Sequence, residues 1–117
     1  MKQDTPLPGR PVRGSDSGRP VMALLDLLGR RWALRVLWEL RDGAVPTFRD
    51  LQHRCGDVSS SVLAARLREL TEARLVGRTG EGYRLTQQGD ALTSALRPLN
   101  EWAKAWAQSV PSDGPAG

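Results

Sequence analysis

The sequence predicts a mainly α-helical fold with one small β-hairpin, arranged as a winged helix-turn-helix. Two observations favour it: apolar residues recur at helical spacing in successive segments, and two short strand-like segments precede the last of these. A chain of 117 residues has room for one domain and its tails. We expect that domain at residues 20–109, with a flexible basic arm at 1–19 and a flexible tail at 110–117.

The first helix is expected to begin at Pro20, because proline fits the first turn of a helix, and to end at Gly29. A second helix is expected from about Trp32 to Arg41. Its apolar positions cover a wide stripe, which indicates burial on nearly all sides. A short third helix follows, with Thr47 as its N-cap.

The fourth helix is expected at residues 60–74, with Ser59 as its N-cap. Its inner face is formed by Leu63, Leu67 and Leu70, which recur at helical spacing. The side chains that then project outward are Ser60, Ser61, Ala64, Ala65 and Arg68. A partner of this helix would meet those five side chains first.

The wing is expected as two strands at residues 76–79 and 83–85, because the glycine-rich turn at 80–82 suits a tight hairpin. Thr86 then caps a long last helix, in which Pro98 predicts a kink or a break. This helix carries more apolar surface than one small domain needs to cover. Its apolar stripe is Leu92, Ala95, Leu96, Leu99, Trp102, Ala103 and Trp106.

Composition and charge indicate a globular protein with an anionic partner. Hydrophobic residues make up 39% and charged residues 26%, as in ordinary domains, and the formal net charge is +4. The single cysteine, Cys55, excludes an internal disulfide and lies on an apolar stripe, which favours a core position over a reactive thiol. No apolar run is long enough for a signal peptide or a membrane span, so a cytoplasmic location is expected.

Several segments resemble one family of regulators by their order and spacing. They are LGRRW at 28–32, FRDL at 48–51, the segment 59–70, LV at 75–76 and YRLTQQG at 83–89. Together they resemble the HxlR-type winged-helix regulators of bacteria, which are related in fold to MarR regulators. The resemblance implies a homodimer that regulates transcription. Each subunit would place one recognition helix in the major groove of double-stranded DNA, with the wing near a minor groove.

The candidate DNA-binding residues lie on the fourth helix and the wing: Ser59, Ser60, Ser61, Ala64, Ala65, Arg66, Arg68, Arg78 and Arg84. Small side chains dominate the outward face, so direct readout of bases is sparse and DNA shape contributes to specificity. Arg66 lies beside the apolar stripe, where it contacts a phosphate or pairs with Asp50. Arg78 and Arg84 either hold phosphates or merely solvate an exposed strand pair.

Trp102 and Trp106 stand four residues apart, so their indoles share one face of the last helix. A dimer seam is the favoured interpretation, and a pocket between subunits for a small planar aromatic effector is the alternative. The residues expected at this interface or pocket are Val21, Leu24, Leu25, Trp32, Trp38, Leu99, Trp102 and Trp106. Oxidant-responsive relatives often carry a cysteine where this chain has Arg19, so a thiol switch by that route is not expected.

Two other classes of function are weaker candidates. An enzyme is disfavoured because the chain has a single histidine, His53, a single cysteine, and neither a glycine-rich phosphate loop nor a metal-spaced cluster. No cofactor or metal is expected, and Glu69 and Glu72 are interpreted as solvated helix charges that also pair with Arg68 or nearby arginines. A winged-helix module that binds protein without specific DNA binding is the alternative to a dimeric, sequence-specific repressor.

Overall fold

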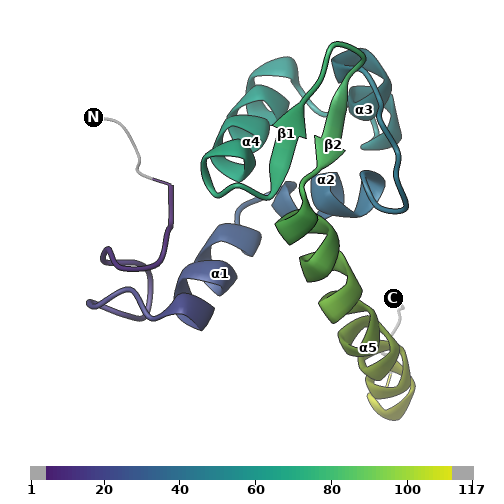
Figure 1. The fold of residues 1–117 in the computed structure, drawn as a ribbon. Helices are drawn as coiled ribbons and strands as arrows, with labels where there is room; N and C mark the ends of the chain where they lie inside the picture. The colour runs from purple at the N-terminus through teal and green to yellow at the C-terminus, as the bar shows by residue number, and fades with distance from the viewer. Residues whose placement is uncertain (1–4, 112–117) are drawn as a thin grey trace.

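The computed structural model describes residues 5–111 and confirms the predicted fold class, since it is mostly helical with one antiparallel hairpin. Figure 1 shows α1 and α5 extending from a body formed by the other elements. In chain order the elements are α1 (Pro20–Leu28), α2 (Ala33–Glu39), α3 (Phe48–Arg54), α4 (Ser60–Glu72), β1 (Val76–Arg78), β2 (Tyr83–Leu85) and α5 (Gln87–Ser109).

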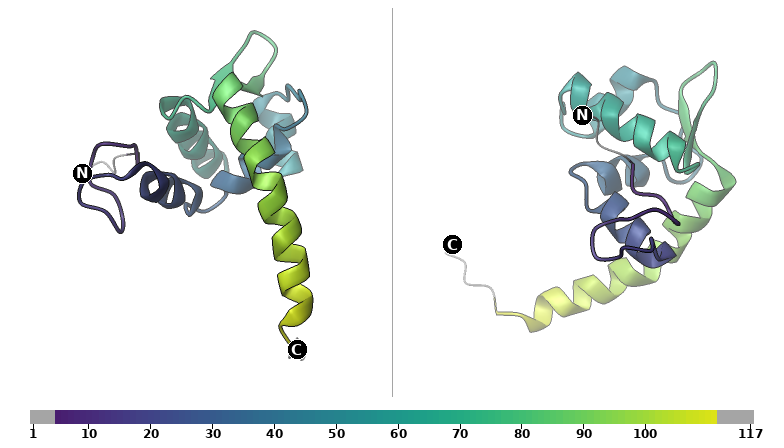
Figure 2. Two further views of the ribbon diagram at one scale, coloured as in Figure 1. Left: turned by 60° about the horizontal axis from the view of Figure 1, so that its bottom comes forward. Right: turned by 90° about the vertical axis from the view of Figure 1, so that its left-hand side faces the viewer.

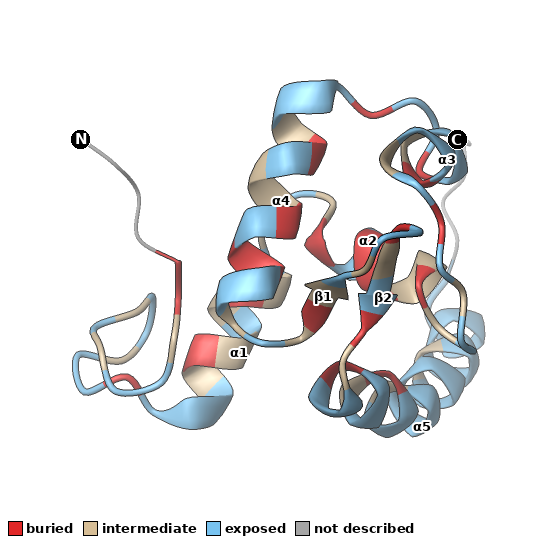
Figure 3. Cartoon of the chain, turned by 45° about the horizontal axis from the view of Figure 1, so that its top comes forward, coloured by how far each residue is buried: buried red, intermediate tan, exposed pale blue. Residues whose placement is uncertain are grey.

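The core lies between α2, α3, α4 and the hairpin, and Figure 3 shows buried segments on each of them. Leu63, Leu67 and Leu70 form the inner face of α4, as predicted. Each leucine removed from water contributes about 1.5–3 kcal/mol, so this apolar cluster provides most of the driving force for folding. Its other fully or largely buried members include Val36, Leu37, Leu40, Leu51, Cys55, Val76 and Leu85.

Three of the helices begin at the predicted N-caps. In each case a Ser or Thr oxygen accepts a hydrogen bond from a backbone N–H that would otherwise lack a helical partner. The three pairs are Thr47 with the N–H of Asp50, Ser59 with that of Val62, and Thr86 with that of Gly89, at 3.0–3.2 Å. The starts of α3, α4 and α5 are therefore encoded locally.

The helix α2 is shorter at both ends than the apolar stripe predicts. Trp32 adopts a left-handed backbone conformation with φ 76°, which places it outside the helix. At the other end Leu40 is the C-cap, and the guanidinium of Arg41 donates to the carbonyl oxygen of Trp38 at 2.8 Å. Leu40 is buried in the core although the backbone has left the helical conformation there. The apolar stripe of the sequence is therefore longer than the helix.

The hairpin is anchored next to its turn by the loop that precedes α3. The N–H of Tyr83 donates to the carbonyl oxygen of Pro46 at 2.9 Å, so β2 lies against that loop. At the tip the hydroxyl oxygen of Thr79 accepts hydrogen bonds from the N–H groups of Glu81 and Gly82. The predicted turn at residues 80–82 is thus confirmed, with β1 ending one residue earlier than expected.

The break expected at Pro98 does not occur, because α5 continues from Gln87 to Ser109. Figure 2 shows it as one unbroken helix. Proline removes the hydrogen bond to the carbonyl of Ser94, but Ser94 and Pro98 are both exposed, so water can satisfy that carbonyl. No membrane-spanning helix is present among the described residues: none is both long and apolar enough.

Residues 5–19 follow a looped path in front of α1. Two hydrogen bonds pair Val12 with Ser15, and the N–H of Gly9 donates to the carbonyl oxygen of Gly18 at 3.0 Å. The hydroxyl of Thr5 donates to Glu72 at 2.6 Å, which joins this loop to α4. The flexibility expected of the two tails stays a prediction, and residues 1–4 and 112–117 lie outside the described part.

Cys55 is a core residue, as its place on the apolar stripe predicts. Its side chain is fully buried at the end of α3, and burial raises the pKa of the thiol above its ordinary value. The nearby Arg35 opposes this rise in pKa, whereas Glu39 reinforces it. The thiol therefore stays neutral near pH 7, the form that is unreactive toward oxidants and electrophiles.

Gly89, in the first turn of α5, should tolerate no side chain. A Cβ at this position would overlap the carbonyl oxygen of Leu75, a backbone atom that cannot yield without moving the strand β1. We expect Gly89→Ala to lower the free energy of unfolding by about 1–3 kcal/mol, measured by urea denaturation. Gly80→Ala is the matched control, because a Cβ there meets open space. Equal stabilities of the two variants would contradict the packing at Gly89.

Candidate nucleic-acid interface

The exposed face of α4 carries small and basic side chains. Ser61, Ala64 and Arg68 are exposed, as predicted for side chains opposite the leucines. Ala65 differs, since it is half-buried. It lies one turn before Glu69 on the same side of the helix, and that side is covered by the ion pairs of Glu69.

Gln52 of α3 fixes the start of α4. Its amide donates to the carbonyl oxygen of Val58 at 2.8 Å and to the hydroxyl oxygen of Ser60 at 3.2 Å. Ser60 therefore helps to hold the turn between the two helices, while Ser59 caps α4. This role of Gln52 was not identified from the sequence. The signal that could have indicated it is a polar side chain on the helix that precedes a predicted N-cap.

Arg66 does not lie where the sequence led us to expect. Its Nε is 3.0 Å from Oε1 of Glu69, an electrostatic contact without hydrogen-bond geometry, and its Nη1 donates to the carbonyl oxygen of Arg31 at 3.2 Å. The expected pairing with Asp50 is not found among the described residues. Arg66 is thus occupied inside the fold, on the side of α4 away from Arg68.

The interpretation of Glu69 as a solvated charge is wrong. Its residue surface is only 3% exposed, and its Oε2 accepts a hydrogen bond from Nη1 of Arg30 at 2.8 Å. A carboxylate is buried at acceptable cost only when opposite charges compensate it. Arg30 and Arg66 supply that compensation from two different parts of the chain.

The structure brings Arg68 and Arg78 together across the depression between α4 and the hairpin. The guanidinium of Arg78 lies 5.4 Å from the ring centre of Tyr83, which limits its freedom. Arg84 lies on the opposite face of the hairpin, since side chains alternate along a strand, and it borders a different depression beside Asp42. The other residues lining the first depression are Phe48, Ala64, Leu67, Thr71 and Glu72.

The terminal tryptophans form an exposed aromatic pair. The rings of Trp102 and Trp106 are stacked at 5.7 Å with an interplanar angle of 10°, which confirms that they are neighbours on one face. They are 60% and 54% exposed, and Leu99 is similarly exposed. On α1, Val21 and Leu25 are also more than half exposed. Among the large apolar side chains of the described residues, these five are the most exposed.

The other residues expected at the dimer seam or effector pocket are divided among separate places. Trp38 lines an apolar groove between α2 and α5, with the guanidinium of Arg41 stacked 4.4 Å from its ring centre. Trp32 instead packs against the core, and Leu24 is half-buried on α1. The remaining residues that line the groove are Leu34, Arg35, Leu96, Leu99, Asn100 and Ala103.

No group of three or more His, Cys, Asp or Glu side chains that could hold a metal ion is found within residues 5–111. His53 lies at the surface, where its Nδ1 is 2.8 Å from Oδ1 of Asp57. Arg68 and Arg78, which line the depression between α4 and the hairpin, place positive charge where it suits an anionic partner.

Known proteins share both this sequence pattern and this architecture. The profile of HxlR-like helix-turn-helix proteins matches residues 27–111. The Uncharacterized HTH-type transcriptional regulator MJ0925 of Methanocaldococcus jannaschii is 27% identical over 93 residues, which cover 75% of this chain and 86% of that protein. YodB of Bacillus subtilis, an HTH-type transcriptional regulator, is 29% identical over 89 residues, or 70% of this chain and 79% of YodB.

Solved structures agree with these sequence matches. The crystal structure of quinone-bound YodB has a TM-score of 0.68 and 30% identity, covering 73% of this chain and 96% of that one. A possible HxlR family transcriptional factor of Thermoplasma volcanium has a TM-score of 0.64 and 27% identity, covering 76% and 85%. The chain therefore belongs to the HxlR-like helix-turn-helix family of transcriptional regulators.

Proposed function

We propose that the protein is a sequence-specific DNA-binding repressor that acts as a homodimer in the bacterial cytoplasm. The observation that carries this proposal is the exposed face of α4, where Ser61, Ala64 and Arg68 point away from the core. An α-helix fits the major groove, in which arginine pairs with guanine and an alanine methyl contacts thymine. A dimer bound over adjacent grooves would block polymerase at an overlapping promoter.

Within this proposal the two arginines of the depression have different tasks. Arg68 lies on the helix that would enter the groove, so it reads a base edge. Arg78 lies on the wing and is steadied by Tyr83, so it holds a backbone phosphate. Ser59 and Ser60 position the helix through its cap and its link to Gln52. Arg84 faces away from α4 and is left with at most a phosphate contact at the edge of the wing.

The proposed homodimer would cover the exposed apolar side chains of α5, together with Val21 of α1. Trp102, Trp106 and Leu99 form a continuous stripe on α5, and the aromatic pair is already stacked before any partner arrives. Burial of tryptophan at the centre of an interface contributes strongly to affinity. Two copies related by a two-fold axis would therefore bury the same apolar stripe of each subunit in one isologous interface.

We also propose that a small aromatic effector binds in the groove between α2 and α5. YodB has been solved with a quinone bound, and in this chain Trp38 and Leu99 give the groove an apolar lining suited to a planar ring. Binding would be non-covalent, because the one thiol is buried in the core. Quenching of tryptophan fluorescence by a panel of quinones and phenols tests the idea, and loss of the signal in Trp38→Phe would place the ligand.

A winged-helix module that binds protein instead of DNA is the second candidate. The observation that favours it is the apolar floor of the depression between α4 and the hairpin, where Phe48 and Leu67 lie beside Ala64. The dependence of affinity on salt concentration distinguishes the two candidate functions. The logarithm of affinity for DNA falls linearly with the logarithm of salt concentration because counterions are released, whereas a protein partner gives little such slope.

Arg68→Ala tests the orientation of α4 directly. We expect affinity for a duplex from the protein's own upstream region to fall by about 1–3 kcal/mol, since a base contact is lost, as measured by fluorescence anisotropy. Arg97→Ala is the matched control, because it removes the same charge from an exposed site on α5. If the two variants lose equal affinity, Arg68 does not contact a base.

Trp102→Ala tests the proposed dimer. We expect the dissociation constant of the homodimer to rise by at least about 30-fold, corresponding to a hot-spot loss of about 2 kcal/mol, as measured by sedimentation equilibrium. Lys104→Ala serves as the control, since Lys104 lies on the same helix and pairs with Glu101 at the surface. A wild-type protein that stays monomeric at high concentration, or a variant that dimerises as tightly as wild type, would rule out this interface.

A further inference from the structure

A tight turn at residues 12–15 holds Arg13 against α1. The backbone N–H of Arg13 donates to Oδ2 of Asp26 at 3.1 Å, which fastens the turn to the helix. Gly14 adopts φ 85°, and a Cβ there would lie 2.5 Å from Cε of Met22, so the tip of the turn packs closely on that side chain. The segment that precedes α1 therefore fixes the position of Arg13.

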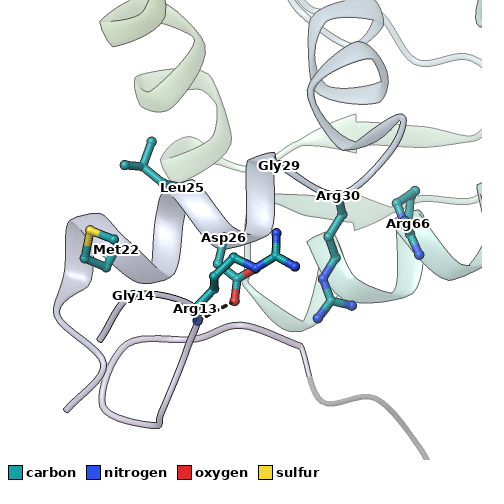
Figure 4. A pocket seen from close by; sticks show the side chains of 8 residues that line it. All are labelled: Arg13, Gly14, Met22, Leu25, Asp26, Gly29, Arg30 and Arg66. Atoms are coloured by element: carbon teal, nitrogen blue, oxygen red, sulfur yellow. Dashed lines mark hydrogen bonds between the residues drawn. The ribbon is translucent and has the colours of Figure 1, made fainter. Parts of the chain in front are cut away.

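Arg13 borders a pocket between this loop, α1 and α4 (Figure 4). Three arginines line it, namely Arg13, Arg30 and Arg66, while Asp26 is its one acidic lining residue within the described chain. Arg30 and Arg66 are shared with Glu69, which lies behind them. The guanidinium of Arg13 makes no hydrogen bond or ion pair to any residue in the described range 5–111.

The pocket also has an apolar wall. Met22 and Leu25 come from one side of α1, and Leu25 is 56% exposed. Figure 4 shows these two side chains on α1 and the guanidinium groups of Arg13 and Arg30 together on the other side of the space. A ligand matched to this lining needs a negative charge at one end and an apolar body at the other.

We propose that this pocket binds a small organic carboxylate, with the carboxylate held by Arg13 and Arg30 and the apolar body lying on Met22 and Leu25. Arginine suits this task because its planar fork donates two parallel hydrogen bonds to a carboxylate. An inorganic anion or a DNA phosphate would leave the apolar wall in contact with water. This site is separate from the groove between α2 and α5, and its occupation does not depend on DNA binding.

Occupation of the pocket is coupled to the DNA-reading helix through Arg30. The same guanidinium that meets the ligand donates to Glu69, a buried residue of α4. A carboxylate that draws Arg30 toward itself weakens this contact and leaves Glu69 to Arg66 alone. We therefore expect the ligand to reduce the affinity of α4 for its duplex, on the condition that the proposed DNA binding is correct.

Benzoate is the probe, and the full chain is the sample. Isothermal titration should give a dissociation constant of about 1 mM, with amide shifts concentrated at Arg13, Gly14 and Gly29 in heteronuclear NMR spectra. Arg13→Gln should weaken binding at least about tenfold, since a charge-assisted hydrogen bond is lost. Arg13→Lys should retain part of the affinity, and Arg19→Gln, a change on the same loop outside the pocket, should retain all of it.

The uncharged analogue benzamide should bind at least about tenfold more weakly than benzoate. Equal binding of the two compounds, equal binding to Arg13→Gln and wild type, or amide shifts confined to the α2 and α5 groove would each overturn the site. If Arg13→Gln weakens duplex binding when benzoate is absent, the pocket takes a DNA phosphate and the proposal is also overturned.

The coupling between the pocket and α4 is tested separately, by measuring duplex affinity with and without benzoate. Saturating benzoate should weaken duplex binding at least about fivefold, the lower end of typical coupling between sites. Duplex affinity that does not change while benzoate occupies the pocket overturns the coupling and leaves the site standing. A protein that binds benzoate but no duplex at any salt concentration contradicts the proposed function instead, so the two failures are distinguishable.

Discussion

A buried carboxylate determines how the helix α4 sits on the rest of the molecule. Glu69 of α4 lies between Arg30, which follows α1, and Arg66, one turn earlier on its own helix. Arg66 also donates to the carbonyl oxygen of Arg31, so both arginines tie the α1 to α2 junction to α4. Removing Glu69 would take from both arginines the carboxylate that they share inside the fold.

This network specifies an orientation that the leucine core alone would not. Apolar packing is non-directional, and a helix whose inner face is all leucine can rotate slightly at little cost. The ion pairs of Glu69 tolerate much less rotation, because their distances near 3 Å must be kept. With Glu69 held in place, Arg68, one position earlier and about 100° around the helix, is directed toward the hairpin. The network thus provides specificity of position more than net stability.

The sequence predicted those features whose cause is local. Thr47, Ser59 and Thr86 are separately recognisable as caps because each partner N–H is three residues away. Glu69 was misjudged because its main partner, Arg30, is 39 residues distant and helical spacing carries no information about it. The same limit applies to Arg78 and Arg84, whose separation onto two faces follows only from the observed register.

The break at Pro98 was misjudged for a different reason: the cost of proline depends on whether the freed carbonyl can reach water. That exposure reflects the division of α5 into two halves. The first half contains the buried residues Gly89 and Thr93, and Gly89 lies against Leu75 and Leu85 at the root of the hairpin, whereas the second half has no buried residue among those described. At 1.5 Å per residue the whole helix is about 35 Å long, close to the separation of successive major grooves on one face of DNA. In the homodimer proposed above, joined through the second half, the first half of α5 would connect each α4 to the interface, and the packing at Gly89 would help to fix that connection.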